Sequence, residues 1–131
     1  MKIGIVCTSF HKEKMDMMLH HASEESISNG LELAVIEWVP GVMEIPLTVN
    51  RMLKENNLNG IVTLGIIEEG KTQHGAVIGQ AVINSIINLQ LKYNTPIGLG
   101  IIGPGAKKEH IVPRIKPHSI AAVKAVVKML K

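Results

Sequence analysis

The residues best suited to chemistry lie in positions 65–74, where an apolar, β-branched run ends. Gly70-Lys71-Thr72 follow the run, and His74 stands where a helix is expected to begin. Backbone N–H groups at a helix N-terminus bind anions, and histidine is the side chain that titrates near neutral pH. The order of residues therefore predicts an anion site at the loop with a titratable group, His74, beside it. An ordinary surface position for His74 remains an equal alternative at this point.

The same stretch matches the nucleotide-binding pattern G-x-x-x-x-G-K-[ST] between Gly65 and Thr72. A nucleotide-hydrolysing enzyme also needs an acidic residue after another apolar strand, where it organises magnesium. The sole Asp of the chain is Asp16, within the first expected helix, and Glu68 and Glu69 would stand inside the phosphate loop. We interpret the match as accidental.

The other histidines do not predict a metal site. His20 and His21 are adjacent, so on a helix they point about 100° apart. His110 and His118 lie among prolines without the spacing of metal ligands. We expect these four side chains to be solvated, and we expect no metal.

The bulk properties limit the class of protein. The chain has 131 residues, of which 46% are hydrophobic, and a formal charge of +3, so we expect one domain spanning 1–131. No run of Lys or Arg predicts nucleic-acid binding, and no apolar stretch reaches the roughly 18 residues that span a membrane. The single Cys7 excludes an internal disulfide, and the chain starts with a strand-like run rather than a signal peptide. We expect a soluble, cytoplasmic protein.

Strand and helix patterns alternate along the chain. Apolar runs at 2–7, 31–39, 60–67 and 96–102 predict four strands, the last of them ended by Gly103-Pro104-Gly105. Thr72 is the expected N-cap of a helix that reaches about Tyr93, and Pro113 and Pro117 are expected to interrupt the final helix. Alternation of this kind predicts an α/β fold, with a parallel sheet covered by helices on both faces. Ligands of such sheets bind beyond the carboxyl ends of the strands.

The helix expected after Thr72 is apolar around much of its circumference. Its residues include Val77, Ile83, Ile87 and Leu91, whereas a surface helix needs only one apolar stripe. In so small a domain, burial against another subunit explains the pattern better than deep burial within the domain. We therefore expect a homo-oligomer.

Three blocks together resemble one family. They are Val39-Pro40-Gly41-Val42-Met43-Glu44-Ile45-Pro46, Leu64-Gly65 with Gly70-Lys71-Thr72-Gln73-His74, and Gly100-Ile101-Ile102-Gly103-Pro104-Gly105. The chain resembles the 6,7-dimethyl-8-ribityllumazine synthases over its whole length, and its Gly-Pro-Gly loop is most similar to that of the archaeal members.

The resemblance implies a flavodoxin-like, three-layer sandwich with a four-stranded parallel sheet. It implies assembly into pentamers, or into 60-subunit shells of pentamers, with active sites between neighbouring subunits. The implied reaction condenses 5-amino-6-(D-ribitylamino)uracil with 3,4-dihydroxy-2-butanone 4-phosphate, releasing phosphate and water, and needs no cofactor.

The resemblance also implies site residues. Phe10 would stack on the pyrimidine ring, Glu44 would accept hydroxyl hydrogen bonds, and His74 would transfer protons. The implied substrate-binding residues are Phe10, Val42, Met43, Glu44, Ile66, Ile67, Glu68 and Leu99, and the implied phosphate-binding residues are Lys71, Thr72 and Arg114, the last from the adjacent subunit.

Several positions depart from the pattern of the family, and most lie in the ring-binding half. They are His11 in place of Asn, Met43 and Leu99 in place of aromatic residues, Glu68 in place of Ile or Val, Gly75 in place of a larger residue, and Ser119 in place of Lys. A buried carboxylate at 68 would need a partner. Two other relatives therefore remain as alternatives: a non-catalytic shell-forming or flavin-binding protein, and an archaeal-type riboflavin synthase, against which Thr72 and His74 count.

Overall fold

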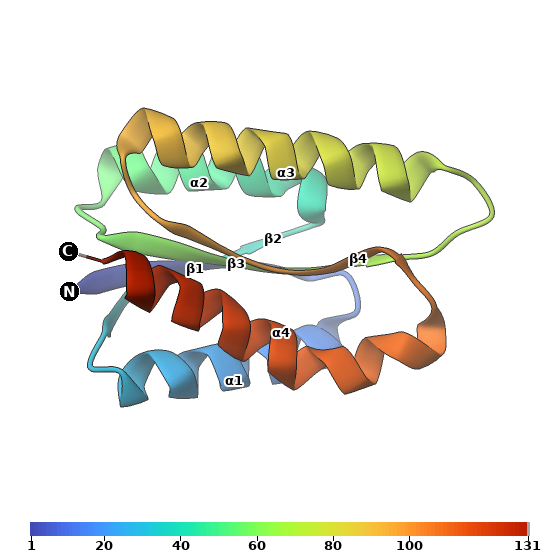
Figure 1. Ribbon diagram of the computed structural model, residues 1–131, viewed down its shortest axis with the longest axis horizontal. Helices are drawn as coiled ribbons and strands as arrows, with labels where there is room; N and C mark the ends of the chain where they lie inside the picture. Colours follow the sequence, from blue (N-terminus) through green and yellow to red (C-terminus); the bar gives the residue numbers. More distant parts are fainter. Residues whose placement is uncertain (131) are drawn as a thin grey trace.

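The computed structural model describes residues 1–130, which form one parallel sheet and the helices that cover it (Figure 1). The strands pair in the order β2-β1-β3-β4, all parallel. The elements in chain order are β1 (Lys2–Thr8), α1 (Lys12–Ser28), β2 (Glu32–Val39), the 3₁₀ turn η1 (Val42–Glu44), α2 (Ile45–Glu55), β3 (Gly60–Glu68), α3 (His74–Tyr93), β4 (Ile97–Ala106) and α4 (Lys108–Met129).

The helices form a layer on each face of the sheet. In Figure 1, α2 and α3 lie on one side of the strands, and α1 and α4 lie on the other. The arrangement confirms the predicted α/β, flavodoxin-like sandwich with a four-stranded parallel sheet. Because all strands run the same way, the ends of β1, β2 and β3 meet at one edge, where the segments carrying the candidate residues begin.

Each face of the sheet packs its own apolar core. Alternate residues of a strand point to opposite faces, so neighbouring β1 residues enter different cores. Ile5 and Cys7 pack with Met15 of α1 and Ile111 of α4. Val6 packs in the other core, among residues of α2 and α3 such as Val49 and Ile86.

The middle strands are buried, whereas the edge strand β2 is not. In β3, every residue from Gly60 to Ile67 is buried. In β2, Ile36 is 41% exposed and Trp38 is 38% exposed. The helices therefore cover β2 less completely than the other strands, and the expectation that every strand is covered on both sides is wrong for β2.

The end of β4 differs from the prediction. The strand does not stop before Gly103-Pro104-Gly105 but continues to Ala106, which pairs with Glu68 after a shift in register. Gly103 and Gly105 have positive φ values of 96° and 88°, a conformation that glycine adopts without steric cost. The two glycines let the strand bend and still rejoin the ladder.

The final helix also differs from the prediction, because α4 runs unbroken through Pro113 and Pro117. Both prolines lie on its exposed side, where water can solvate the carbonyl groups that lose their helical hydrogen bonds. On the opposite side, Ile111, Ile115 and Ser119 are buried at a spacing of four residues. Packing of this apolar stripe holds the helix continuous.

The start of α3 lies one residue beyond the predicted cap. Gln73 is the N-cap residue, and Thr72 precedes it. The Thr72 hydroxyl still accepts a hydrogen bond from the backbone N–H of His74, at 3.3 Å. Among the described residues, no helix is long and apolar enough to cross a membrane.

Candidate active site

A cavity of about 340 Å³ opens at the carboxyl edge of the sheet. Its position, beyond the ends of adjacent parallel strands, is where sheets of this type bind ligands. Five of the predicted substrate-binding residues meet in its wall, together with four residues that were not predicted individually. The lining consists of Phe10, Val42, Glu44, Ile66 and Ile67, with Thr8, Pro40, Gly41 and Ile78 added by the structure.

A larger cavity, of about 510 Å³, lies at the opposite edge of the sheet. Its wall combines aliphatic side chains with amides and one hydroxyl, and it contains no titratable side chain. The lining residues are Leu58, Asn59, Gln90, Leu91, Asn94, Thr95, Pro96, Met129 and Leu130. Because acid–base chemistry needs a titratable group, the smaller cavity is the candidate active site.

Phe10 forms an outer wall of the candidate cavity. The backbone N–H of Ser9 donates to the carbonyl of Val39 at 2.8 Å, which ties the chain before Phe10 to the end of β2. The Phe10 side chain is 57% exposed, and its ring lies 4.2 Å from the imidazole of His11 at an angle of 58°. The ring therefore presents an open face to a planar ligand.

Glu44 is oriented by a local backbone contact. The backbone N–H of Gly41 donates to Glu44 Oε1 at 2.9 Å, and Glu44 N donates to the Gly41 carbonyl at 3.2 Å. These two contacts close η1 and hold the carboxylate at the cavity wall. Val42 of the same turn lines the cavity, whereas Met43 is 60% exposed and is not among the lining residues.

Thr8 lies deepest in the wall. It is 1% exposed, and its Oγ1 has no hydrogen-bond partner among residues 1–130. The hydroxyl would be 3.5 Å from a Cβ at Gly65, so a glycine there leaves room beside it. The sequence placed Thr8 at a strand end, but no motif marked its hydroxyl as a binding group.

The predicted phosphate loop lies beside a second hollow of about 400 Å³. Lys71 lines this hollow, and Lys107 and Lys108 approach from the beginning of α4. Glu69 and Glu109 also contribute to the wall. Lys107 and Lys108 were not predicted, because the bend in β4 brings the start of α4 close to Lys71 and the sequence did not indicate this bend. Thr72 is exposed and does not line the hollow.

His74 is the first residue of α3 and is exposed. Ile78, one helical turn later, lines the cavity. Residues four apart lie on the same face of a helix, so His74 is on the cavity side of α3 but beyond the lining residues. A Cβ on Gly75 would lie 3.1 Å from Ile67 Cγ2, and this lack of space explains a small residue after the histidine.

Arg114 and Leu99 do not join the cavity within this chain. Arg114 is exposed on α4, which covers the sheet face opposite α2 and α3, and its Nη1 donates to the His110 carbonyl at 2.8 Å. Leu99 is 41% exposed on the edge strand β4. Glu68 does not line the cavity either, and its carboxylate lies 3.9 Å from His11 Nε2.

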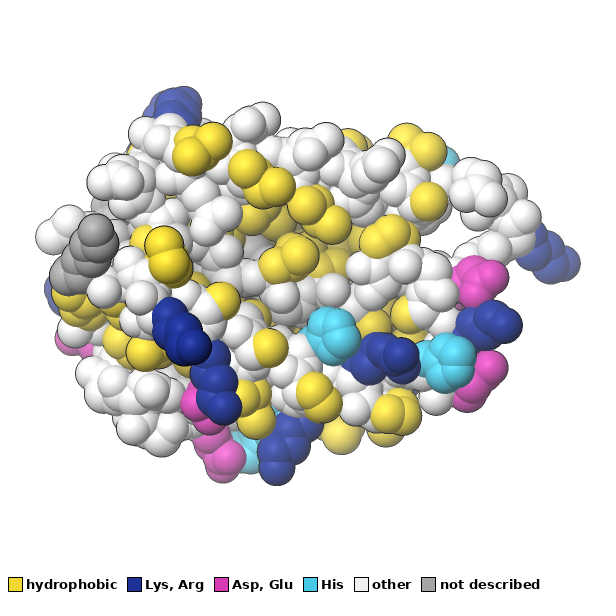
Figure 2. Space-filling view, in the orientation of Figure 1, with side chains coloured by type: hydrophobic (Ala, Val, Ile, Leu, Met, Phe, Trp, Pro, Cys, Tyr) yellow, Lys and Arg dark blue, Asp and Glu magenta, His cyan; other side chains and the backbone are white. Residues whose placement is uncertain are grey.

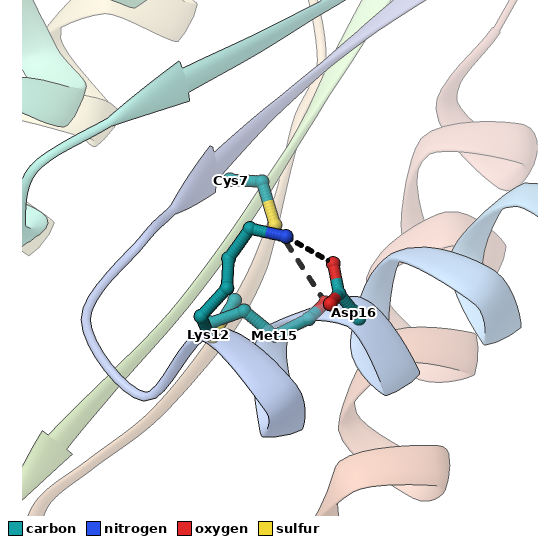
Figure 3. A network of polar contacts seen from close by, with 4 residues as sticks. All are labelled: Cys7, Lys12, Met15 and Asp16. Carbon is teal, nitrogen blue, oxygen red and sulfur yellow. Dashed lines mark hydrogen bonds and ion pairs between the residues drawn. The ribbon is translucent and has the colours of Figure 1, made fainter.

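Cys7 is not a nucleophile in this fold. Its side chain is fully buried, and the Sγ lies 3.8 Å from the carbonyl of Met15, beside the ion pair of Lys12 and Asp16 (Figure 3). Burial, with a smaller contribution from the negative charge of Asp16, raises the pKa of the Cys7 thiol to about 12. The thiol therefore stays protonated, and Cys7 packs as a small core residue.

Hydrophobic side chains gather along α3 and in the hollow between α3 and α4 (Figure 2). Val77, Ile87 and Leu91 of α3 are 64%, 46% and 76% exposed, and Val112 of α4 is 55% exposed. The predicted helix is thus apolar on its outward side as well. Among residues 1–130, no group of three His, Cys, Asp or Glu side chains could hold a metal ion.

The fold is an α/β, flavodoxin-like sandwich, and it has a cavity at the carboxyl ends of its strands. The chain also matches a family model over residues 1–131, and the model is described as 6,7-dimethyl-8-ribityllumazine synthase. This chain belongs to that family.

Curated relatives agree with the family model. A 6,7-dimethyl-8-ribityllumazine synthase of Metallosphaera sedula is 38% identical over 130 residues, which cover 99% of this chain and 86% of the relative. The protein of that name from Staphylothermus marinus is 36% identical over 129 residues, which cover 98% and 86%. The one from Saccharolobus solfataricus is 32% identical over 130 residues, which cover 99% and 84%. The sources are archaeal, in agreement with the resemblance of the Gly-Pro-Gly loop.

Proposed function

We propose that this chain is a lumazine synthase of riboflavin biosynthesis. It condenses 5-amino-6-(D-ribitylamino)uracil with 3,4-dihydroxy-2-butanone 4-phosphate to give 6,7-dimethyl-8-ribityllumazine, phosphate and water. Membership of the family supports the reaction class. The observation that carries the proposal within the molecule is the cavity that joins Phe10, Glu44 and Ile67 on the side of α3 that also bears His74.

The cavity takes the ribitylaminouracil in this proposal. Phe10 offers an aromatic face to the pyrimidine ring, and Ile66 and Ile67 contribute an apolar wall. Glu44, oriented by Gly41, accepts hydrogen bonds from the ribityl hydroxyls. The unpartnered Thr8 hydroxyl provides a further polar contact at the bottom of the cavity. Such contacts fix the substrate amine for attack on the ketone.

The phosphate of the second substrate binds at the loop. Lys71 and Thr72 supply charge and a hydroxyl, and Lys107 and Lys108 add charge from the same chain. Arg114 of α4 does not line this hollow, and its guanidinium donates to the His110 carbonyl, so we assign it, as the family resemblance implies, to the phosphate site of a neighbouring subunit. The protein needs no nucleophile of its own, because the substrate amine attacks the ketone. His74 moves protons while phosphate leaves and the ring closes.

Because Arg114 is assigned to the phosphate site of a neighbouring subunit, the proposal requires a homo-oligomer. The exposed apolar side chains of α3 and Val112 of α4 support an interface on these helices. We propose a pentamer, alone or as twelve pentamers in a 60-subunit shell, with an active site at each subunit contact. The free thiol of Cys7 is compatible with a reducing compartment, and we propose a cytoplasmic location.

The test is to mix the purified protein with both substrates and follow lumazine absorbance. A control without protein is essential, because the two substrates react slowly unaided. The proposal predicts a rate well above the control. A rate equal to the control would contradict it and would leave a non-catalytic member of the family.

A further inference from the structure

The side chains of His11 and Glu68 meet at the rim of the candidate cavity. His11 follows β1 and Phe10, and Glu68 is the last residue of β3, so the contact joins the ends of two neighbouring strands. His11 Nε2 and Glu68 Oε2 are 3.9 Å apart, and the side chains are 22% and 34% exposed. This distance is within the range of an ion pair and beyond that of a hydrogen bond.

His11 is held in an unfavourable state. Its backbone lies in the left-handed region, with φ 62° and ψ 51°, which residues other than glycine adopt rarely. Its Nε2 is buried and has no hydrogen-bond partner among residues 1–130. Features of this kind persist where the surrounding structure imposes them, and they concentrate at functional sites.

Two contacts relate His11 to its surroundings. Its imidazole lies against the ring of Phe10, with 4.2 Å between the centroids, and its Nε2 faces the carboxylate of Glu68. The neighbouring cation, Lys12, is engaged elsewhere: its Nζ pairs with Asp16 at 2.6 Å and lies 4.3 Å from the centroid of Trp38. The imidazole is therefore the group placed to pair with Glu68.

The backbone that carries Glu68 is fixed. Glu68 pairs with Ala106 of β4, and the N–H of Glu69 donates to the Ala106 carbonyl at 2.8 Å. The carboxylate does not line the cavity, whereas Phe10 does. The carboxylate is therefore linked to the cavity through the imidazole of His11 and the ring of Phe10.

We propose that His11 and Glu68 form a positioning pair for the ring-binding half of the site. The carboxylate orients the imidazole, and the imidazole sets the angle at which Phe10 receives the heterocycle. This inference rests on the proposed function and adds residues to its ring-binding half. Neither side chain touches the reacting atoms, so the pair determines affinity for ribitylaminouracil and not the chemical step.

The test uses His11→Gly, Glu68→Gln and the double variant. Glycine adopts the left-handed backbone without steric cost, so His11→Gly removes the imidazole and does not introduce the Asn that the family usually has at this position. The proposal predicts that each single substitution raises KM for ribitylaminouracil about fivefold to tenfold and that the double variant is no worse than the singles, since residues in contact are not additive. KM for the butanone phosphate and kcat stay unchanged.

The chain contains a matched control pair. His20 and Glu24 of α1 are joined at 3.1 Å, but their side chains are 63% and 66% exposed and line neither the candidate cavity nor the phosphate hollow. His20→Asn and Glu24→Gln should leave both KM values unchanged. Additive effects of His11→Gly and Glu68→Gln, equal increases in both KM values, or the same response from the control pair would each overturn the proposal.

Two measurements separate failure of this proposal from failure of the proposed function. Calorimetric titration with ribitylaminouracil alone measures the affinity of each variant without turnover. If the wild type binds this substrate but does not catalyse the reaction, the proposed function is contradicted, and the affinities of the variants still test the pair. A crystal structure of the unliganded protein tests the contact itself. His11 Nε2 within about 3.2 Å of a Glu68 oxygen supports the pair, and an imidazole turned away from Glu68 overturns it, whatever the activity.

Discussion

The candidate cavity and the predicted phosphate loop both lie at the carboxyl ends of the strands, but a single chain encloses the cavity more completely than the loop. The cavity is bounded by parts of β1, η1, β3 and α3, and Thr8 and Ile67 in its wall are buried. The loop that carries Lys71 and Thr72 is exposed, and its predicted partner Arg114 is on the opposite face of the sheet.

This difference concerns how the two substrates are bound. A planar heterocycle gains affinity from burial against apolar walls, and one chain provides those walls. A phosphate gains affinity from cations that converge on it, and cations of one chain placed close together repel each other. Assigning Arg114 to a neighbouring subunit brings the charges together only on assembly. The following substitutions test this division.

The largest expected effect is that of His74→Ala. Removing a residue that transfers protons in the transition state should lower kcat by about 100-fold to 10,000-fold, with both KM values little changed. Steady-state lumazine formation measures this change. His20→Ala, which removes an exposed histidine of α1, serves as the control and should be neutral. A His74→Ala enzyme with full kcat would remove His74 from the mechanism.

Arg114→Ala should act on one substrate. Loss of a charge-assisted contact to phosphate should raise KM for the butanone phosphate by about 10-fold to 100-fold, while the affinity for ribitylaminouracil is unchanged. Lys124→Ala, at an exposed position near the other end of α4, is the matched control. An unchanged KM for the phosphate substrate in Arg114→Ala would show that our assignment of this residue is wrong.

Cys7 predicts a dependence of stability on pH. The thiol of the folded protein has a pKa of about 12, above the ordinary value of 9.0, so the folded state retains a proton that the unfolded state loses as the pH rises above 9. Stability is therefore unaffected below pH 9 and falls above it, by at most about 1.4 kcal/mol per pH unit. Urea unfolding of the wild type and of Cys7→Ala between pH 8 and 10.5 measures the difference. The advantage of the wild type should shrink with pH, and a constant difference would contradict the assignment.

The smallest expected effect compares two buried threonines. Thr8 Oγ1 has no partner among residues 1–130, whereas Thr63 Oγ1 donates to the Gly98 carbonyl at 2.9 Å. Thr8→Val should raise the free energy of unfolding by about 1 kcal/mol and raise KM for ribitylaminouracil, and Thr63→Val should lower the free energy of unfolding by a similar amount. Equal losses of stability in urea unfolding would mean that the Thr8 hydroxyl is satisfied.

Much of the fold could be predicted because the sequence signals are local. The apolar runs and the glycine and proline punctuation located the four strands, and alternation with helices implied the parallel sheet. The continuity of α4 through Pro113 could not be predicted, because it depends on buried contacts of Ile111 and Ile115 with distant parts of the chain. The extension of β4 to Ala106 likewise depends on pairing with Glu68.

The candidate site was predicted in part for the same reason. The family resemblance implied Phe10, Glu44 and Ile67, and these residues do meet at the cavity. Each lies near the end of a strand or the start of a helix. Lys107 and the contact of His11 with Glu68 depend on which strand ends become neighbours, and no spacing in the sequence encodes that. Whether Arg114 reaches a phosphate depends on a second subunit.

The most direct test of the account mixes two variants, each of which is expected to be slow at low butanone phosphate. His74→Ala and Arg114→Ala subunits, co-expressed in equal amounts and purified as mixed assemblies, are assayed for lumazine formation at low butanone phosphate. If each site combines His74 of one subunit with Arg114 of its neighbour, random mixing gives about one quarter of sites with both residues intact and restores a corresponding share of wild-type activity. Mixed assemblies no more active than the two parents would contradict a site shared between subunits.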